Sequence, residues 1–166
     1  MEGLSKKEIE IISWLEFYKK YFFTSQDIDR FSRNKTHRYN IIKNLLKKKR
    51  IFKLNMTKYY LVPIKAKSGG LAEDSFIIAD EVFNGKNYFI GGWAAANYWR
   101  LTEQIPMKIE IYSTKRQGIK KLLGTTFIFR RTTKKMTDKA VIEKISEHQF
   151  RILSRNEVKK WMKQKK

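Results

Sequence analysis

A charged, glycine-containing stretch, KAKSGGLAED at residues 65–74, interrupts the hydrophobic pattern of this 166-residue chain. Its Ser-Gly-Gly core disfavours both helix and strand, and its composition is typical of a linker. The spacing of apolar residues changes across it, so the two sides do not form one continuous pattern of elements. We therefore expect two small domains, residues 1–64 and 76–166, joined by a linker at residues 65–75.

The first domain has a pattern of three helices followed by a hairpin. Ser5 and Glu8 have the spacing of a capping box, and the apolar residues that follow have helical spacing. Two β-rich runs flank a turn at Asn55-Met56-Thr57. The expected elements are helices at about 6–20, 26–31 and 36–49, a turn at 32–34 and a hairpin at 51–64. This order is that of a winged helix-turn-helix.

The second domain has a mixed pattern. Gly91-Gly92 forms a sharp break before an alanine-rich segment with high helix propensity. Ser154 and Glu157 have the spacing of a second capping box. The expected elements are helices at 76–83 and 93–101, strands at 88–90, 108–113 and 125–131, a hairpin around Glu147-His148 and a short last helix. The fold class is therefore α+β, with a winged helix-turn-helix followed by a small mixed α/β domain.

The charge of the chain indicates a polyanionic partner. The chain has 37 Lys+Arg against 16 Asp+Glu, a formal net charge of +21, and both halves are basic. Such a balance is most often found in proteins that bind nucleic acid, and less often in those that bind membrane surfaces. A solvated basic surface is the alternative. With no cysteine, no signal region and no run of roughly 20 apolar residues, we expect a soluble cytoplasmic protein that binds no membrane.

In the third expected helix, polar and apolar residues stand in different halves, as they do in a recognition helix. Residues 35–50 contain seven basic residues and no acid. The first turns, at 36–40, are polar, whereas the apolar residues stand in the second half, where they can dock on other helices. Arg38 has the geometry to bind guanine and Asn40 adenine. The alternative is an amphipathic helix with a solvated basic face, and the basic run 47–50 also suits the helix dipole.

These observations give a set of candidate DNA contacts. Arg33, Lys35 and Lys43 would lie near phosphates, which position a protein without specifying sequence. Lys53 and Lys58 on the hairpin would contact the DNA backbone or the minor groove. The candidates on the helix and the turn before it are Arg33, Lys35, Thr36, His37, Arg38, Tyr39, Asn40 and Lys43.

Three segments of the second domain carry a resemblance to a known family. They are YFIGGWAAANYWRLTEQIP (88–106), YSTKR (112–116) and GTTFIFRR (124–131). From the residues alone, the first segment is the packing core of a small α/β domain. Together the three resemble the C-terminal domain of AbiEi-type antitoxins, the regulators of type IV, abortive-infection toxin–antitoxin systems. Members of this family commonly join such a domain to an N-terminal winged helix-turn-helix.

The resemblance implies a function. It implies an autorepressor that binds inverted repeats in its own promoter and opposes a toxin of the nucleotidyltransferase type. Carried over by position, Thr36–Lys43 would read the DNA, and Asn55–Lys58, including Asn55, Thr57 and Lys58, would form the tip of the wing. Many members continue into further helices after the region that corresponds to FRILSRNEV (150–158), whereas this sequence has one short expected helix there and stops at Lys166. We therefore expect either an antitoxin or a stand-alone regulator.

The sequence predicts no catalytic site, no cofactor and no metal site. The segment 118–125 lacks the Gly-Lys-Ser/Thr end of a phosphate loop. The two histidines, His37 and His148, stand far apart without a ligand pattern, and the Glu-x-Lys at Glu157 is explained by helix capping. Two other functions stay open as alternatives. The first is an RNA- or ribosome-associated binding module, and the second is a metal-dependent nuclease.

The second domain adds basic residues whose partner the sequence does not decide. They are candidates for contacts to the DNA backbone or to an acidic surface of a toxin. The oligomeric state and the operator are likewise undecided. The six residues are Lys115, Arg116, Lys120, Lys121, Arg130 and Arg131.

Overall fold

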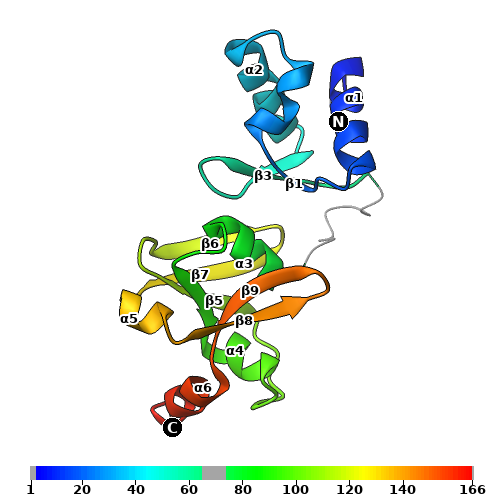
Figure 1. The fold of residues 1–166 in the computed structure, drawn as a ribbon. Coiled ribbons are helices and arrows are strands. Elements are labelled where there is room, and N and C mark those ends of the chain that lie inside the picture. The colour runs from blue at the N-terminus through cyan, green and yellow to red at the C-terminus, as the bar shows by residue number, and fades with distance from the viewer. Residues whose placement is uncertain (1–2, 65–73, 166) are drawn as a thin grey trace. The chain divides into compact units, whose positions relative to one another are not determined.

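A computed structural model describes residues 3–64 and 74–165 of the chain. The fold is α+β, and the chain divides into two compact units, residues 1–72 (unit 1) and 73–166 (unit 2) (Figure 1). Most of the predicted linker, residues 65–73, lies outside the described residues. Its last two residues are the start of a helix and not linker: Asp74 caps α3, its carboxylate accepting from the Phe76 amide at 2.7 Å, and Ser75 is the first helical residue.

Unit 1 consists of helices and a small antiparallel sheet. The strands pair in the order β1-β3-β2. The predicted helices, turn and hairpin are present, but α1 and α2 end sooner than expected, and β1 was not predicted. The elements are α1 (Lys6–Phe17), β1 (Phe22–Thr24), the 3₁₀ helix η1 (Ser25–Phe31), α2 (Lys35–Lys47), β2 (Ile51–Lys53) and β3 (Lys58–Leu61).

The core of unit 1 follows from the helical spacing of its apolar residues. Each helix directs one apolar face inward, and Phe23 and Ile51 close the core from the sheet. In α2 the buried residues stand in the second half of the helix, so its first turns stay at the surface. The buried helical residues are Ile11, Ile12 and Leu15 of α1, Ile28 and Phe31 of η1, and Ile41, Ile42 and Leu45 of α2.

A buried ion pair joins the start of α1 to the end of α2. The predicted capping box is confirmed, since the Ser5 hydroxyl accepts from the Glu8 amide and the Ser5 amide donates to the Glu8 carboxylate. Lys48 Nζ donates to Glu8 Oε2 at 2.7 Å and to the Gly3 carbonyl oxygen at 2.9 Å. Burial opposes the charge of Glu8, but the hydrogen bonds from Lys48 and Ser5 outweigh it and lower its pKa.

Unit 2 is built on a six-stranded mixed sheet in the order β6-β7-β5-β4-β9-β8. The β4–β9 and β5–β7 pairs are parallel, and the other neighbours are antiparallel. The elements are α3 (Ser75–Phe83), β4 (Tyr88–Gly91), α4 (Gly92–Tyr98), β5 (Lys108–Ser113), β6 (Gly118–Leu122), β7 (Thr125–Arg131), α5 (Lys134–Thr137), β8 (Ala140–Ile145), β9 (His148–Leu153) and α6 (Arg155–Lys163).

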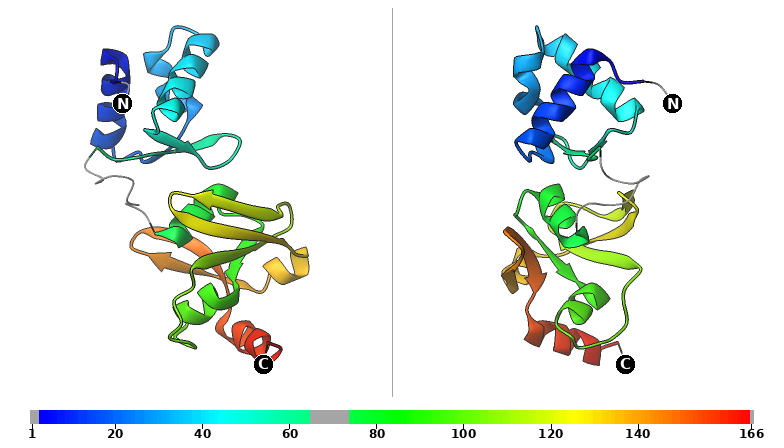
Figure 2. Two further views of the ribbon diagram at one scale, coloured as in Figure 1. Left: turned by 180° about the vertical axis from the view of Figure 1, so that it is seen from behind. Right: turned by 90° about the vertical axis from the view of Figure 1, so that its right-hand side faces the viewer.

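Helices cover both faces of this sheet. Tyr88 of β4 stacks on Phe83 of α3, with ring centroids 5.1 Å apart. Because successive side chains of a strand point to opposite faces, Phe89 faces away from α3, and with Trp161 of α6 it lines a hollow of about 450 Å³. The rings of Trp93 in α4 and Trp161 in α6 meet edge to face, and Figure 2 shows the two helices side by side.

The glycine pair at the centre of the chain is required by close packing. A Cβ atom on Gly91 would lie 2.7 Å from the ring of Tyr112, which is stacked on Phe89. Gly92 has a φ of +59°, and a Cβ atom there would lie 2.6 Å from Glu110 Oε2. The Tyr112 hydroxyl donates to that same oxygen at 2.9 Å, and burial together with the Glu110 charge raises the pKa of Tyr112 to about 12.

Several predictions for unit 2 need correction. The helix after the glycine pair ends at Tyr98 and not at 101. The capping box predicted at Ser154 is wrong, because Ser154 makes no side-chain capping bond. Instead, Glu157 accepts from Lys139 Nζ at 2.8 Å and from Lys160 Nζ at 2.7 Å, and these bonds lower the pKa of Glu157 to about 2. Strand β6 and helix α5 were not predicted.

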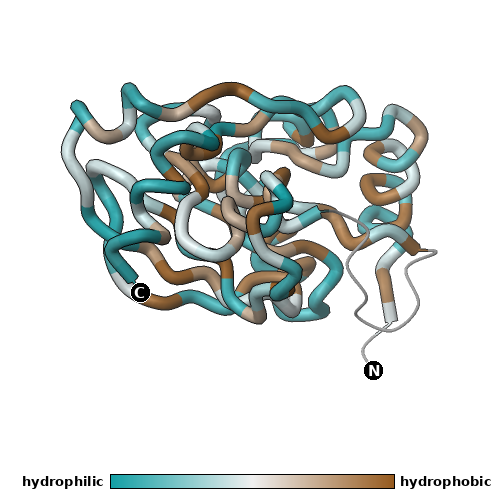
Figure 3. The backbone as a smooth tube through the Cα atoms, turned by 90° about the horizontal axis from the view of Figure 1, so that it is seen from below, coloured by the Kyte–Doolittle hydropathy of each residue, from teal (hydrophilic) through white to brown (hydrophobic). Residues whose placement is uncertain are grey.

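Apolar and polar segments follow one another along both units, as the backbone coloured by hydropathy shows (Figure 3). Among the described residues, no helix combines the length and the apolar character that crossing a membrane requires.

Candidate functional site

A basic hollow lies between α2 and the hairpin of unit 1. Its volume is about 380 Å³. Lys35, Tyr39 and Lys43 are spaced at i, i+4 and i+8, so they lie on the same face of α2, and Lys53 of β2 joins them at the rim. Tyr39 is 65% exposed. None of the described residues that line this hollow is acidic, and it can therefore accept an anion or a chain of phosphates.

A second hollow lies on the other side of the first turns of α2. It has a volume of about 710 Å³ and is lined by Lys7, Arg33, Asn34, Thr36, His37 and Asn40. The Asn34 side chain caps α2 by accepting from the His37 amide at 2.8 Å. His37 Nδ1 in turn accepts from the Arg33 amide at 3.2 Å. These two bonds fix the start of the helix and leave Thr36 and Asn40 exposed at the surface.

Arg38 is partly buried, makes an ion pair within unit 1 and also lines the basic hollow. Its guanidinium pairs with the Asp29 carboxylate of η1, and its side chain is only 18% exposed. The sequence predicted that Arg38 contacts guanine. In the structure this side chain links the second and third helices through Asp29, and the predicted contact with guanine stays a prediction.

The tip of the hairpin is shaped by Asn55. Its side-chain oxygen accepts from the Thr57 amide at 3.0 Å, the Thr57 hydroxyl at 3.3 Å and the Lys58 amide at 2.9 Å. An Asn side chain that bonds to following amides forms such a turn readily. Between these residues, Met56 is 90% exposed. The predicted wing-tip residues are thus close together, but Asn55 is occupied in forming the turn.

The six basic candidates of unit 2 fall into two groups. Lys115 and Arg116 follow β5, and the strand register brings them near Arg130 and Arg131 at the end of β7. Two of these four make contacts within the unit. The Arg116 guanidinium lies 4.4 Å from the centre of the Phe129 ring, and burial lowers its pKa. Arg130 pairs with Glu110 at 3.4 Å.

The second group is Lys120 and Lys121 on β6, which pair with Phe127 and Thr126 nearer the start of β7. The register therefore does not gather all six residues at one end of the sheet.

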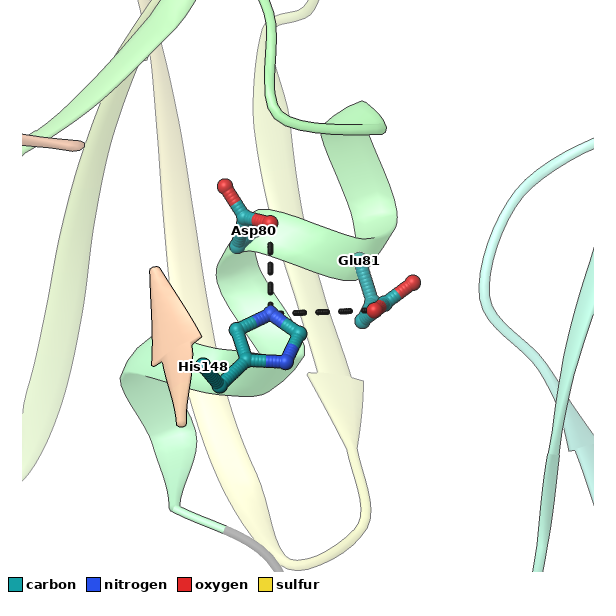
Figure 4. Close-up of side chains that lie close together, drawn as sticks. All are labelled: Asp80, Glu81 and His148. Atoms are coloured by element: carbon teal, nitrogen blue, oxygen red, sulfur yellow. Dashed lines mark hydrogen bonds and ion pairs between the residues drawn. The ribbon is translucent and has the colours of Figure 1, made fainter. Parts of the chain in front are cut away.

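A histidine and two carboxylates meet in unit 2 (Figure 4). Asp80 and Glu81 stand near the end of α3, and His148 begins β9. His148 Nε2 lies 3.3 Å from Asp80 Oδ2 and 3.6 Å from Glu81 Oε1. The sequence predicted no ligand group for His148. No local pattern marks the group, since 68 positions separate Asp80 from His148 and the sheet topology alone brings them together.

The chain matches no family model and no curated protein.

Proposed function

We propose that unit 1 is a winged helix-turn-helix and that the protein is a sequence-specific repressor that binds double-stranded DNA. The observation that supports this most directly is the surface of α2. Its polar first turns are exposed beside one hollow, and the lysines at positions 35 and 43 lie with Lys53 around another. A recognition helix needs both features, base-reading side chains at its start and cations that hold the adjacent phosphates.

The roles of single residues follow from their exposure. Asn40 and Thr36 are exposed at the start of α2, where an Asn side chain can bind adenine bidentately. Lys35, Lys43 and Lys53 neutralise phosphates. Arg38 pairs with Asp29 of η1 and also lines the basic hollow, so in this proposal it helps to position α2, and its contact with guanine stays a prediction.

The repressor is proposed to act on its own gene. The resemblance of residues 88–131 to AbiEi-type antitoxins supports an autoregulating antitoxin, whose operator contains inverted repeats and whose partner is a nucleotidyltransferase-type toxin. In this proposal the basic residues of unit 2 contact either that toxin or the DNA backbone. The DNA target can be tested without the toxin, and it is therefore tested first.

The experiment is a mobility shift with DNA from upstream of the gene, with scrambled DNA and structured RNA as competitors. We expect Asn40→Ala to cost about 1–3 kcal/mol of binding free energy on the operator and to relax specificity, because one base contact is lost. Lys43→Ala should weaken binding to all DNA sequences and reduce the slope of log K against log salt by about 1. Lys6→Ala, on the exposed surface of α1 and outside both hollows, is the matched control.

Two results would contradict the proposal. Equal affinity for operator, scrambled DNA and structured RNA, unchanged by Asn40→Ala, would exclude base reading by α2 and favour a general polyanion binder. Selective binding to structured RNA would favour an RNA-associated module. Because Arg38→Ala also breaks the pair with Asp29, its effect on binding must be compared with its effect on the unfolding of unit 1.

A further inference from the structure

We propose that Asp80, Glu81 and His148 of unit 2 form a binding site for a divalent metal ion, with Zn²⁺ as the preferred ion. The site goes beyond the proposed function, since it lies outside unit 1 and does not depend on DNA. One imidazole nitrogen and two carboxylate oxygens meet there, all within 4.8 Å of one another. The three side chains are 13–27% exposed, so the group is partly enclosed but open to an ion from solvent.

The two distances from His148 to the carboxylates are close to those around a tetrahedral ion. Zinc bonds to nitrogen and oxygen are about 2.0–2.1 Å long, so two ligand atoms around a tetrahedral zinc ion lie about 3.3–3.4 Å apart. The distances from His148 Nε2 to the two carboxylates are 3.3 and 3.6 Å. The ligand atoms of all three residues lie within 4.8 Å of one another, and binding of the ion would draw the two carboxylates closer together. Three protein ligands leave a fourth position for water, an arrangement that is common at zinc sites.

A single hydrogen bond accounts for only one of the two carboxylates. A single N–H can point well at only one acceptor, and 3.6 Å is too long for a hydrogen bond. Yet both carboxylates approach the same nitrogen, Nε2 of His148. A cation placed among the three groups would be bound by all of them, and imidazole is the commonest metal ligand among side chains.

The surroundings hold these ligands in place. The buried Tyr88 hydroxyl donates to Asp80 Oδ1 at 2.6 Å and leaves Oδ2 directed at His148. The Arg151 amide donates to the Tyr88 hydroxyl at 3.0 Å, and the Arg151 side chain donates to the Gly85 carbonyl oxygen at 3.0 Å. These bonds tie β9 to the end of α3. Hydrogen bonds of this kind orient ligands at metal sites.

The test uses the full-length, tag-free chain in a buffer without chelators. The chain has no cysteine and only two histidines, so competing sites are few. Zn²⁺ binding is measured by calorimetry, and Co²⁺ replaces it as a spectroscopic probe. We expect one Zn²⁺ per chain, a higher melting temperature with Zn²⁺, and visible Co²⁺ absorption bands of a tetrahedral site. His148→Gln should weaken Zn²⁺ binding by about tenfold or more and remove the bands.

His37→Gln is the matched control, because it removes the other histidine, which lies in unit 1. It should leave Zn²⁺ affinity and the Co²⁺ spectrum unchanged. Asp80→Asn provides a second variant, which should weaken binding even if His148→Gln alters the β8–β9 turn. Circular dichroism checks that each variant is folded. Absence of Zn²⁺ binding to the wild type, or equal binding by wild type, His148→Gln and Asp80→Asn, would overturn the proposal.

Discussion

At position 92 of unit 2, both the backbone conformation and the packing favour glycine over any residue with a side chain. Its φ is +59°, and an added Cβ atom would lie 2.6 Å from Glu110 Oε2, which the Tyr112 hydroxyl holds in place. Gly92→Ala should therefore lower the free energy of unfolding of unit 2 by about 2–4 kcal/mol, from left-handed strain and overpacking together. Denaturant unfolding followed by tryptophan fluorescence measures the change.

Gly85→Ala separates the two causes. Gly85 also has a positive φ, +71°, but an added Cβ atom would lie 3.8 Å from Asp80, which is ordinary contact. Its substitution should cost only the backbone strain, about 1–2 kcal/mol. Equal losses for the two variants would show that the contact with Glu110 is unimportant. The sequence predicted a tight turn or a close approach at the glycine pair, but it could not identify Tyr112 and Glu110 as the neighbours.

At the scale of elements, the Glu8–Lys48 pair joins α1 to α2. Glu8→Gln should lower the free energy of unfolding of unit 1 by about 1–3 kcal/mol at neutral pH, because Lys48 loses a charged acceptor. The folded-state pKa of Glu8 lies below its ordinary value of 4.5. The stability that its charge contributes is therefore complete above that value and is lost as the pH falls through the folded-state pKa.

The difference between wild type and Glu8→Gln should accordingly shrink below pH 4.5. Denaturant unfolding at a series of pH values measures it. Glu10→Gln is the control, since Glu10 makes only an exposed pair with Lys7 and should change stability little. A difference that stays constant down to low pH would show that the charge of Glu8 does not stabilise unit 1.

Elements that depend on local patterns could be predicted, whereas those that depend on pairing could not. Helices α1 and α3 and strands β5 and β7 follow from the spacing of their apolar residues. Strand β1 has three residues and exists because Phe22, Phe23 and Thr24 pair with β3. Strand β6 has glycine and two lysines, so only its pairing with β7 defines it. The capping box at Ser154 failed because Glu157 bonds to Lys139, which is distant in sequence.

At the scale of the whole molecule, sheet topology determines which chemical groups meet. The parallel pairing of β9 with β4 places the start of β9 beside the end of α3. His148 consequently reaches Asp80 and Glu81, although nothing in the local sequence marks them as a group. In unit 1 the local sequence is sufficient, because the exposed and buried residues of α2 follow directly from its helical period. The exposed face of α2 could therefore be predicted from the sequence, and the meeting of Asp80, Glu81 and His148 could not.

Because each unit has its own hydrophobic core, we expect the two units to unfold separately. The core of unit 1 is formed by residues between Ile11 and Leu61, and α3–α6 with the six-stranded sheet enclose that of unit 2. We expect two calorimetric transitions. Gly92→Ala should shift only one and Glu8→Gln only the other, by about 4–8 °C for each kcal/mol lost. The double variant should show both shifts without further change. A single transition that both substitutions lower would instead show that the two units unfold together.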